Sequence, residues 1–269
     1  MNVRSFSTLL GILLATLVSG CASLPNTTTE KIRDRNVEFA LTKHDTIPIV
    51  FENGLGGRME YWNKVIPKIS SDTTTFLYNR PGYGRSDEVS TPRDGTHVVD
   101  ELRSLLQSKG LNPPYLLVGH SLGGLYMQLF ARRYPNQVSA LILVDSTHPE
   151  QFKGKGAPDN WPSWFKVAFS LWTSKVEKDE MEYINQTGEA VLSLPSFTEK
   201  PVIILSASQP MKNKSELADY ANDKRKDFMR LYPGSKQVWV DSGHAIPLEE
   251  PESVASAIRE VLMSIEPNK

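Results

Sequence analysis

The chain has 269 residues, of which 39% are hydrophobic and 23% are charged. These proportions are ordinary for a globular domain, and they exclude a disordered chain, a collagen-like repeat and a protein with several membrane spans. The 30 Lys and Arg residues balance 31 Asp and Glu residues, so the formal net charge is −1. This balance provides no basic excess for binding nucleic acid or an anionic membrane surface. One domain is the simplest interpretation of this length.

The N-terminus has the organisation of a secretory signal. Arg4 precedes a mostly apolar stretch at residues 9–18, which is shorter than the ~20 residues of a spanning helix but suits the apolar region of a signal peptide. Val18-Ser19-Gly20-Cys21 contains the only cysteine of the chain, and it resembles the lipobox of bacterial lipoproteins. The resemblance implies cleavage after residue 20 and lipidation of Cys21. An ordinary signal peptide cut near Ala22 is the alternative.

We therefore divide the chain into a signal peptide at 1–20, a lipidated tether at 21–32 and a globular domain at 33–269. The tether is predicted because its residues show no hydrophobic periodicity. Several acyl chains would anchor the protein stably, which predicts a location in the bacterial cell envelope. Ala22, in place of an aspartate after the cysteine, suggests the outer membrane facing the periplasm if the host is Gram-negative.

Short apolar runs alternate with helical patterns along the domain, as is typical of a mostly parallel sheet with helices on both faces. Strands are predicted at residues 37–41, 47–51, 74–78, 115–118, 141–144, 202–205 and 237–240, and helices at 59–69, 98–109, 122–134, 215–231 and 251–265. Residues 146–200 have helical spacing without a convincing strand. We predict that they form an inserted helical lid.

The strongest chemical signal is Gly119-His120-Ser121-Leu122-Gly123, between a predicted strand and a predicted helix. In this setting glycines two residues before and after the serine allow a sharp turn, which presents the hydroxyl at a helix N-terminus. The alternative is a glycine-rich turn that only packs the helix on the sheet.

Three motifs together resemble the α/β-hydrolase superfamily from about Ile47 to Ile265. They are the motif around Ser121, the glycine-rich loop at residues 80–87 (RPGYGRSD) and the pair Gly243-His244. The resemblance implies an α/β-hydrolase fold, with a mostly parallel central sheet, helices on both faces and the lid inserted after strand 6. It implies a scaffold, not a substrate. A serine at the turn argues against the epoxide-hydrolase and haloalkane-dehalogenase branches, which use a carboxylate there.

A serine nucleophile needs a general base within hydrogen-bond reach. His244 is the candidate because its loop follows the last predicted strand, at the sheet end where the Ser121 turn also lies. We expect His44 and His97 at the surface, His120 in a structural role and His148 near the lid entrance.

The resemblance also implies an oxyanion hole formed by the backbone amides of Leu122 and Leu55. Leu55 lies in the loop at residues 52–57, where Asn53 stands in place of the family's usual histidine. Because the expected donor is a main-chain group, this departure need not impair catalysis.

The acid that orients the histidine has more than one candidate. Asp145 directly follows the predicted strand at 141–144, whereas the loop after 202–205 has no carboxylate before Glu216. We favour Asp145 and keep Glu216 and Asp219 as alternatives. Asp145 could instead only cap its turn.

The lid bears on substrate class. An apolar face is predicted from residues that recur at helical spacing: Trp161, Trp164, Phe165, Ala168, Phe169 and Trp172. Such a face either packs in the core or lines an acyl pocket. The acidic residues that follow, Glu177, Asp179, Glu180 and Glu182, suggest a solvated face or, as in aminopeptidases of this fold, a site for a substrate's amine.

The sequence thus predicts a serine hydrolase that cleaves esters of small to medium apolar acyl groups through Ser121, His244 and Asp145. The alternatives are an aminopeptidase of the proline-iminopeptidase type and a non-catalytic envelope lipoprotein that retains the fold. No cofactor and no metal are predicted, because the sequence has neither metal-ligand spacing nor a dinucleotide fingerprint. The expected partners are a small-molecule ester and, through the lipid anchor, a membrane. The sequence leaves the oligomeric state open.

Overall fold

A computed structural model describes residues 24–69, 71–209 and 215–265. Its centre is an eight-stranded sheet with the order β1-β2-β4-β3-β5-β6-β7-β8. β1 pairs with β2 and β2 with β4 in antiparallel fashion, and all other neighbours are parallel. The strands are β1 (Thr27–Ile32), β2 (Arg35–Thr42), β3 (Ile49–Glu52), β4 (Thr75–Tyr78), β5 (Tyr115–His120), β6 (Val138–Val144), β7 (Val202–Ala207) and β8 (Lys236–Val240).

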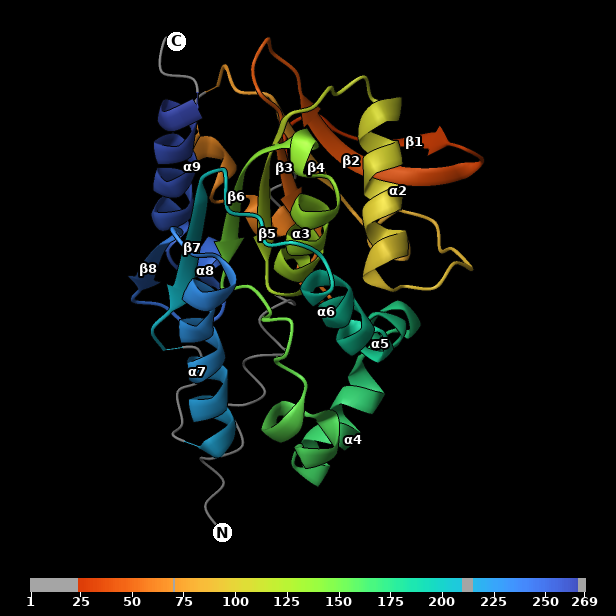
Figure 1. Cartoon of the computed structure of the whole chain (residues 1–269). Coiled ribbons are helices and arrows are strands. Elements are labelled where there is room, and N and C mark those ends of the chain that lie inside the picture. Colours follow the sequence, from red (N-terminus) through yellow and green to blue (C-terminus); the bar gives the residue numbers. More distant parts are fainter. Residues whose placement is uncertain (1–23, 70, 210–214, 266–269) are drawn as a thin grey trace.

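Helices cover both faces of the sheet (Figure 1), and an apolar layer of buried side chains lies on each face. Val50 of β3 packs into the layer formed with helices α2 (Gly95–Ser108), α3 (Leu122–Arg133), α6 (Ile184–Leu192) and α7 (Glu216–Leu231). Its neighbours Ile49 and Phe51 pack into the opposite layer with α9 (Pro251–Ile265). This alternation follows from the two-residue period of a strand, and burial on both faces explains the uninterrupted apolar runs. The predicted fold class is confirmed.

The helix predicted at residues 59–69 is wrong. The segment forms two 3₁₀ turns, η2 (Met59–Trp62) and η3 (Ile66–Lys68). Pro67 lacks an amide hydrogen and disfavours the α conformation of the residue before it, so a continuous α-helix cannot run through the segment. Burial of Met59 and Trp62 produces the apolar spacing without a regular helix.

The predicted tether at 21–32 is also wrong over residues 27–32, which form β1. This strand pairs with β2 from Thr27↔Ala40 to Ile32↔Arg35, and Leu24 before it is buried. β1 is an edge strand with mostly exposed side chains, so its sequence lacks the apolar periodicity that would reveal it. The predicted signal peptide and Cys21 lie outside the described residues.

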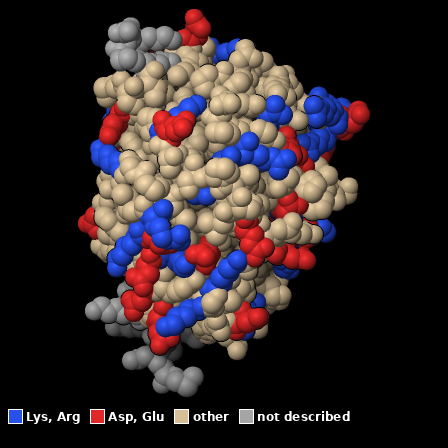
Figure 2. Space-filling view, in the orientation of Figure 1, with Lys and Arg blue, Asp and Glu red and all other residues tan. Residues whose placement is uncertain are grey.

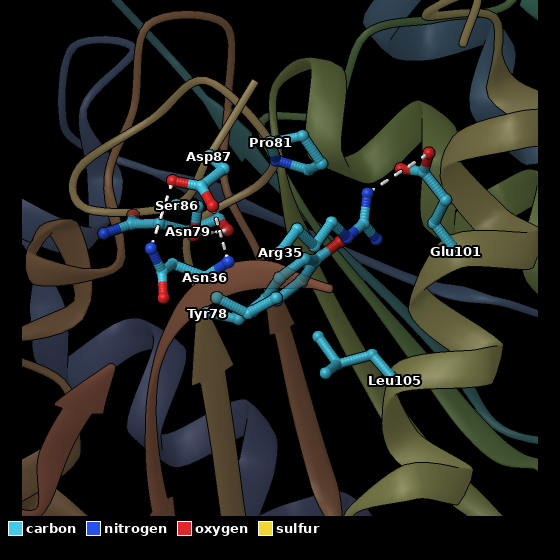
Figure 3. Close-up of a pocket in the computed structure, with 10 residues that line it drawn as sticks. Arg35, Asn36, Tyr78, Asn79, Pro81, Ser86, Asp87, Glu101 and Leu105 are labelled. Atoms are coloured by element: carbon cyan, nitrogen blue, oxygen red, sulfur yellow. Dashed lines mark hydrogen bonds and ion pairs between the residues drawn. The ribbon is translucent and has the colours of Figure 1, made fainter. Parts of the chain in front are cut away.

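The glycine-rich loop after β4 folds back over β2 and is hydrogen-bonded to it. Asp87 accepts hydrogen bonds from the amide and side chain of Asn36, at 2.6 and 3.4 Å (Figure 3). Ser86 Oγ accepts one from the Glu38 amide at 2.9 Å. The adjoining cavity of about 10 Å³ has room for one water molecule at most. The loop is therefore a packed structural element.

The lid lies between β6 and β7 and contains α4 (Ser163–Trp172), α5 (Lys175–Glu182) and α6, preceded by the short turns η5 (Gly154–Gly156) and η6 (Pro158–Asn160). These three helices lie beyond the lower end of the sheet in Figure 1, the end toward which β6 and β7 point. The parallel strands therefore direct their carboxyl ends toward the lid.

Helix α4 does not present the predicted single apolar face. The Trp161 ring contacts those of Phe165 and Phe169 at centroid distances of 5.0 and 5.7 Å, whereas Trp164 and Trp172 are exposed.

Acidic and basic side chains lie interspersed on the face shown in Figure 2. Within the described residues, no helix combines the length and apolar character needed to span a bilayer.

Candidate active site

Ser121 lies between β5 and α3 in a conformation that few non-glycine residues adopt, with φ 52° and ψ −124°. Such strained backbone persists only where the surroundings enforce it. Here two glycines allow the close packing, because a Cβ on Gly119 would lie 2.7 Å from the carbonyl oxygen of Gly123, and one on Gly123 would collide with the backbone of Asn53. The predicted turn therefore presents the Ser121 hydroxyl at the start of α3.

The structure brings Ser121, His244 and Asp145 together in one hydrogen-bonded row. His244 Nε2 lies 3.0 Å from Ser121 Oγ, and His244 Nδ1 lies 2.5 Å from Asp145 Oδ2. Each residue follows the carboxyl end of a strand, β5, β8 or β6. Ser121 and His244 are half-buried, whereas Asp145 is buried. The row can therefore meet a substrate at its serine end while its acid is shielded from water.

Arg225 of α7 is a member of this site that the sequence did not reveal. Its guanidinium grips Asp145 in a fork, with Nε 2.7 Å from Oδ1 and Nη2 2.8 Å from Oδ2, and the Ala207 amide donates to Oδ1 at 3.0 Å. Burial by itself would raise the pKa of Asp145. The charge and hydrogen bonds of Arg225, with the bond from His244, instead hold this pKa well below its usual range. Asp145 is therefore a carboxylate throughout the physiological pH range.

The alternative acids lie elsewhere. Glu216 and Asp219 are exposed residues in the first turn of α7, and neither forms a hydrogen bond or ion pair with His244. Within the described residues, Asp145 is the carboxylate that meets His244 Nδ1.

The loop after β3 brings backbone directly beside Ser121. A Cβ on Gly54 would lie 3.1 Å from the Ser121 Cβ, so the loop passes as closely as a glycine allows. Leu122 occupies the first position of α3, where an amide has no acceptor within its own helix. No residue of the described chain accepts a hydrogen bond from the amide of Leu55 or Leu122. Both amides are therefore available as donors.

Asn53, which stands in place of a histidine, has a structural role. Its Nδ2 donates to the Tyr78 carbonyl at 3.0 Å, and its Oδ1 accepts from Trp62 Nε1 at 2.8 Å. The side chain therefore fixes the start of the loop against β4 and η2.

Buried Arg80 supports the same loop from behind. Its guanidinium donates to the carbonyl oxygens of Asn53 and Gly54, at 2.6 and 2.9 Å, and pairs with Glu52 at 2.7 Å. It also pairs with Glu180 of the lid at 2.7 Å. One buried cation thus connects the lid with the loop beside Ser121.

The acidic segment of the lid is only partly a solvated face. Glu180 is buried, and its two oxygens accept hydrogen bonds from Arg80 and Tyr83. Asp179 pairs with Lys175, and Glu177 completes the capping box of α5. The predicted solvated face is wrong for Glu180, because a cation 100 residues earlier in the chain compensates its charge.

The other histidines have local partners. His120 Nε2 lies 2.9 Å from the His244 carbonyl oxygen, and the His120 ring lies between those of Tyr61 and His244. Burial, with a contribution from the charge of His244, lowers the pKa of His120 to about 3, so this ring is neutral. His97 contacts Asp94 at 2.5 Å, and His44 is exposed.

His148, Glu150 and Asp227 form a cluster whose possible ligand atoms lie within 4.8 Å of one another. His148 Nδ1 accepts from the Glu150 amide at 3.1 Å, so the proton of the neutral ring is on Nε2, which lies 3.1 Å from Asp227. A protonated nitrogen cannot bind a metal ion, and Lys224 and Arg230 pair with the two carboxylates. The cluster is therefore an ion-pair network.

The fold and this row of side chains define a member of the alpha/beta hydrolase class. A sequence profile described as "alpha/beta hydrolase fold" matches residues 47–241, and the chain belongs to this family. It is 32% identical over 239 residues to an uncharacterised protein of Schizosaccharomyces pombe, covering 74% of this chain and 44% of that protein. It is 31% identical over 140 residues to human (lyso)-N-acylphosphatidylethanolamine lipase, covering 48% of this chain and 39% of the lipase. The chain thus matches less than half the length of these two relatives.

Solved structures show the same fold. An esterase of Thermogutta terrifontis superposes with a TM-score of 0.63 and 19% identity, over 89% of this chain and 98% of the esterase. The thioesterase domain of a curacin biosynthetic pathway superposes with a TM-score of 0.62 and 14% identity, over 87% of this chain and 98% of that domain.

Proposed function

We propose that this protein is a serine hydrolase that cleaves carboxylic esters of small to medium apolar acyl groups. The observation that carries the proposal is the row Ser121 Oγ, His244 Nε2 and Nδ1, and Asp145 Oδ2, with contacts of 3.0 and 2.5 Å. A neutral imidazole in this position is a general base for a serine that is otherwise a weak nucleophile.

In the proposed reaction Ser121 Oγ attacks the ester carbonyl carbon while its proton passes to His244 Nε2. The amides of Leu55 and Leu122 donate to the oxyanion, the charge that develops in the transition state. Collapse of the tetrahedral intermediate breaks the bond to the alkoxy oxygen, and His244 returns the proton to the departing alcohol. Water then attacks the acyl-enzyme by the same route and releases the acid. Asp145 holds the tautomer in which Nδ1 carries a proton and Nε2 is free to accept one.

The preference for an ester over a peptide rests on the lid. Both oxygens of the buried Glu180 are bonded to Arg80 and Tyr83, so this lid carboxylate is not available to bind a substrate's amine. We base the apolar acyl group on the aromatic composition of the lid, in which Trp161 contacts Phe165 and Phe169. The names of two relatives, a lipase in human and an esterase in Thermogutta terrifontis, support the same class of reaction.

Labelling with a fluorophosphonate tests the proposal, because this reagent reacts covalently only with an activated serine. We expect wild-type protein to be labelled and Ser121→Ala to remain unlabelled, while Ser193→Ala, at an exposed lid serine, is labelled normally. In parallel, p-nitrophenyl esters of two to eight carbons should be hydrolysed faster than proline p-nitroanilide. A correctly folded wild-type protein that neither reacts with the probe nor cleaves any ester would support the non-catalytic alternative.

We also propose that the protein is anchored in the bacterial envelope through lipidated Cys21, on the strength of the Val18–Cys21 sequence. Leu24, the first described residue, is buried in the domain. Asn26 bonds to Thr42, which pairs with the first residue of β4, at the amino ends of the parallel strands. The first described residues therefore lie at the end of the sheet opposite Ser121.

A further inference from the structure

We propose that Arg225 is a positioning residue for the hydrolytic site, one that fixes the Asp145 carboxylate and limits how strongly it attracts a proton to His244. This inference rests on the proposed function, because it concerns how the same row of side chains works. It starts from an unusual partner for the acid: a full cation, buried beside it and contributed by a helix 80 residues later in the chain.

The contacts of Asp145 leave its carboxylate no freedom to rotate. Oδ1 accepts from Arg225 Nε and the Ala207 amide, and Oδ2 accepts from Arg225 Nη2 and His244 Nδ1. A carboxylate offers about four acceptor positions, so these four bonds fill it. The planar guanidinium fork sets the plane of the carboxylate, and that plane sets the direction of the bond to His244.

Arg225 is itself held firmly. Its Nη1 donates to the Ala221 carbonyl one turn earlier in α7, at 3.1 Å, and its own carbonyl accepts from Gln237 Nε2 of β8 at 2.9 Å. Its side chain is 9% exposed. The position of α7 against the sheet therefore determines where the Arg225 guanidinium holds the Asp145 carboxylate.

The charge of Arg225 has a separate consequence. When His244 gains a proton, the imidazolium faces the Asp145–Arg225 pair, whose net charge is zero, instead of a bare carboxylate. The other groups that face His244 are the neutral His120 ring and the Ser121 hydroxyl, with exposed Glu249 bonded to the neighbouring Gly243 amide. Tyr61 lies against His120. Among the described residues, Arg225 is the cation that pairs with the carboxylate that His244 contacts, and its charge opposes the addition of a second positive charge there.

Two substitutions separate orientation from charge. Arg225→Lys keeps the cation but loses the planar fork, whereas Arg225→Gln keeps a hydrogen-bond donor but loses the cation. The control is Lys226→Gln, which removes one positive charge from the next position of α7, where the side chain is exposed and paired with Asp223. The measurements are kcat/KM against pH with a p-nitrophenyl ester, and the titration of His244 followed by NMR of proteins labelled at the histidine Cε1 carbons. His244→Asn identifies the His244 signal.

We expect both variants to lose about 10- to 100-fold in plateau kcat/KM through misplacement of the base. We expect the acidic-side midpoint of the rate profile and the NMR titration midpoint to rise by roughly one pH unit in Arg225→Gln only. Arg225→Lys and Lys226→Gln should titrate as wild type does. If Arg225→Gln does not fold, the plateau loss in Arg225→Lys still tests the orienting role.

Two results would overturn the inference. One is unchanged midpoints in a folded Arg225→Gln variant, which is what a purely structural role predicts. The other is a wild-type plateau rate in Arg225→Lys. Because NMR reports on His244 without turnover, a shifted midpoint in a protein that cleaves no ester would refute the proposed function and leave the electrostatic role of Arg225 intact.

Discussion

Glu180 of the lid and Arg80 of the loop after β4 form a buried, two-pronged ion pair, with Nε–Oε1 and Nη2–Oε2 distances of 2.7 and 3.0 Å. Arg80 also donates to the carbonyl oxygens of Asn53 and Gly54. The lid and the backbone beside Ser121 therefore share one cation, and a change at the lid end reaches the proposed oxyanion hole.

Glu180→Ala should consequently both destabilise the protein and slow its hydrolysis of esters. Removing one partner of a buried pair leaves an uncompensated charge and costs about 3–5 kcal/mol, here reduced because Glu52 still pairs with Arg80. Displacement of the loop should lower kcat more than it raises KM. Thermal unfolding and ester kinetics measure both effects, with exposed Glu182→Gln on the same helix as the control. Wild-type stability and kcat in Glu180→Ala would refute the coupling.

Ser121→Ala should abolish ester hydrolysis without unfolding the protein. It removes the nucleophile but only one half-buried hydroxyl, and loss of a serine nucleophile typically costs at least ~10³-fold in kcat. Ester turnover and thermal unfolding of the purified variant check the prediction. Substantial turnover by a folded variant would show that another group attacks the substrate.

Asp145→Asn should be nearly inactive, whereas Glu216→Gln and Asp219→Asn should retain activity. The amide favours the wrong tautomer of the imidazole, and in a serine protease the same substitution of the triad aspartate costs ~10⁴-fold in kcat. The substitution also leaves Arg225 without its carboxylate, so the variant should unfold at a lower temperature. Assays therefore belong well below its unfolding temperature.

The double variant Asp145→Asn/Arg225→Gln is the control for that folding defect. Removing the unpaired cation should restore part of the lost thermal stability but none of the activity. If the double variant regains activity, the loss in Asp145→Asn came from folding and Asp145 is not the orienting acid.

Stability should decline below neutral pH because two histidines are buried in the neutral form. Burial lowers the pKa of His120 to about 3 and that of His148 to about 4, against ~6.5 in the unfolded chain. The unfolded state therefore binds protons first as the pH falls below about 6.5, and the folded state loses stability down to the folded-state values. Each histidine should contribute a loss of about 2 kcal/mol between pH 7 and pH 5.

Chemical denaturation at pH 7 and pH 5 measures this loss. His148→Gln, at a residue outside the proposed site, should remove about half of it. The same pH dependence in His148→Gln as in wild type would show that the pKa of this ring is equal in the folded and unfolded protein, and it would contradict the prediction.

Cys21→Ser should move the protein from the membrane fraction to an unprocessed or soluble pool, because no thiol remains to be acylated. Activity toward a water-soluble ester should be unchanged, since the described chain begins at the end of the sheet opposite Ser121. Metabolic labelling with a radioactive fatty acid, followed by fractionation, measures the anchoring. Equal labelling of wild type and Cys21→Ser would exclude this anchor.

The sequence by itself determined the parts of the molecule that depend on local order. Strands buried on both faces are uninterrupted apolar runs, and the Ser121 turn requires glycines at fixed spacing. The sequence therefore predicts both the strands and the turn. The position of His244 after the last strand follows from the same rule, because parallel strands end at one edge of the sheet. β1 was not predicted because an exposed edge strand has no apolar periodicity. The segment at 59–69 was predicted as an α-helix because the buried residues of its 3₁₀ turns have a similar spacing.

Only the tertiary structure decided which charges meet. The contacts of Asp145 with His244 and Arg225 span 99 and 80 residues, and that of Arg80 with Glu180 spans 100. An ion pair of this kind leaves no periodic trace in the sequence, because each partner taken alone is an ordinary surface residue type. Burial makes such a partner obligatory, but the fold decides which one it is. For that reason the acid of the site remained open in the sequence and Arg225 was not visible in it at all.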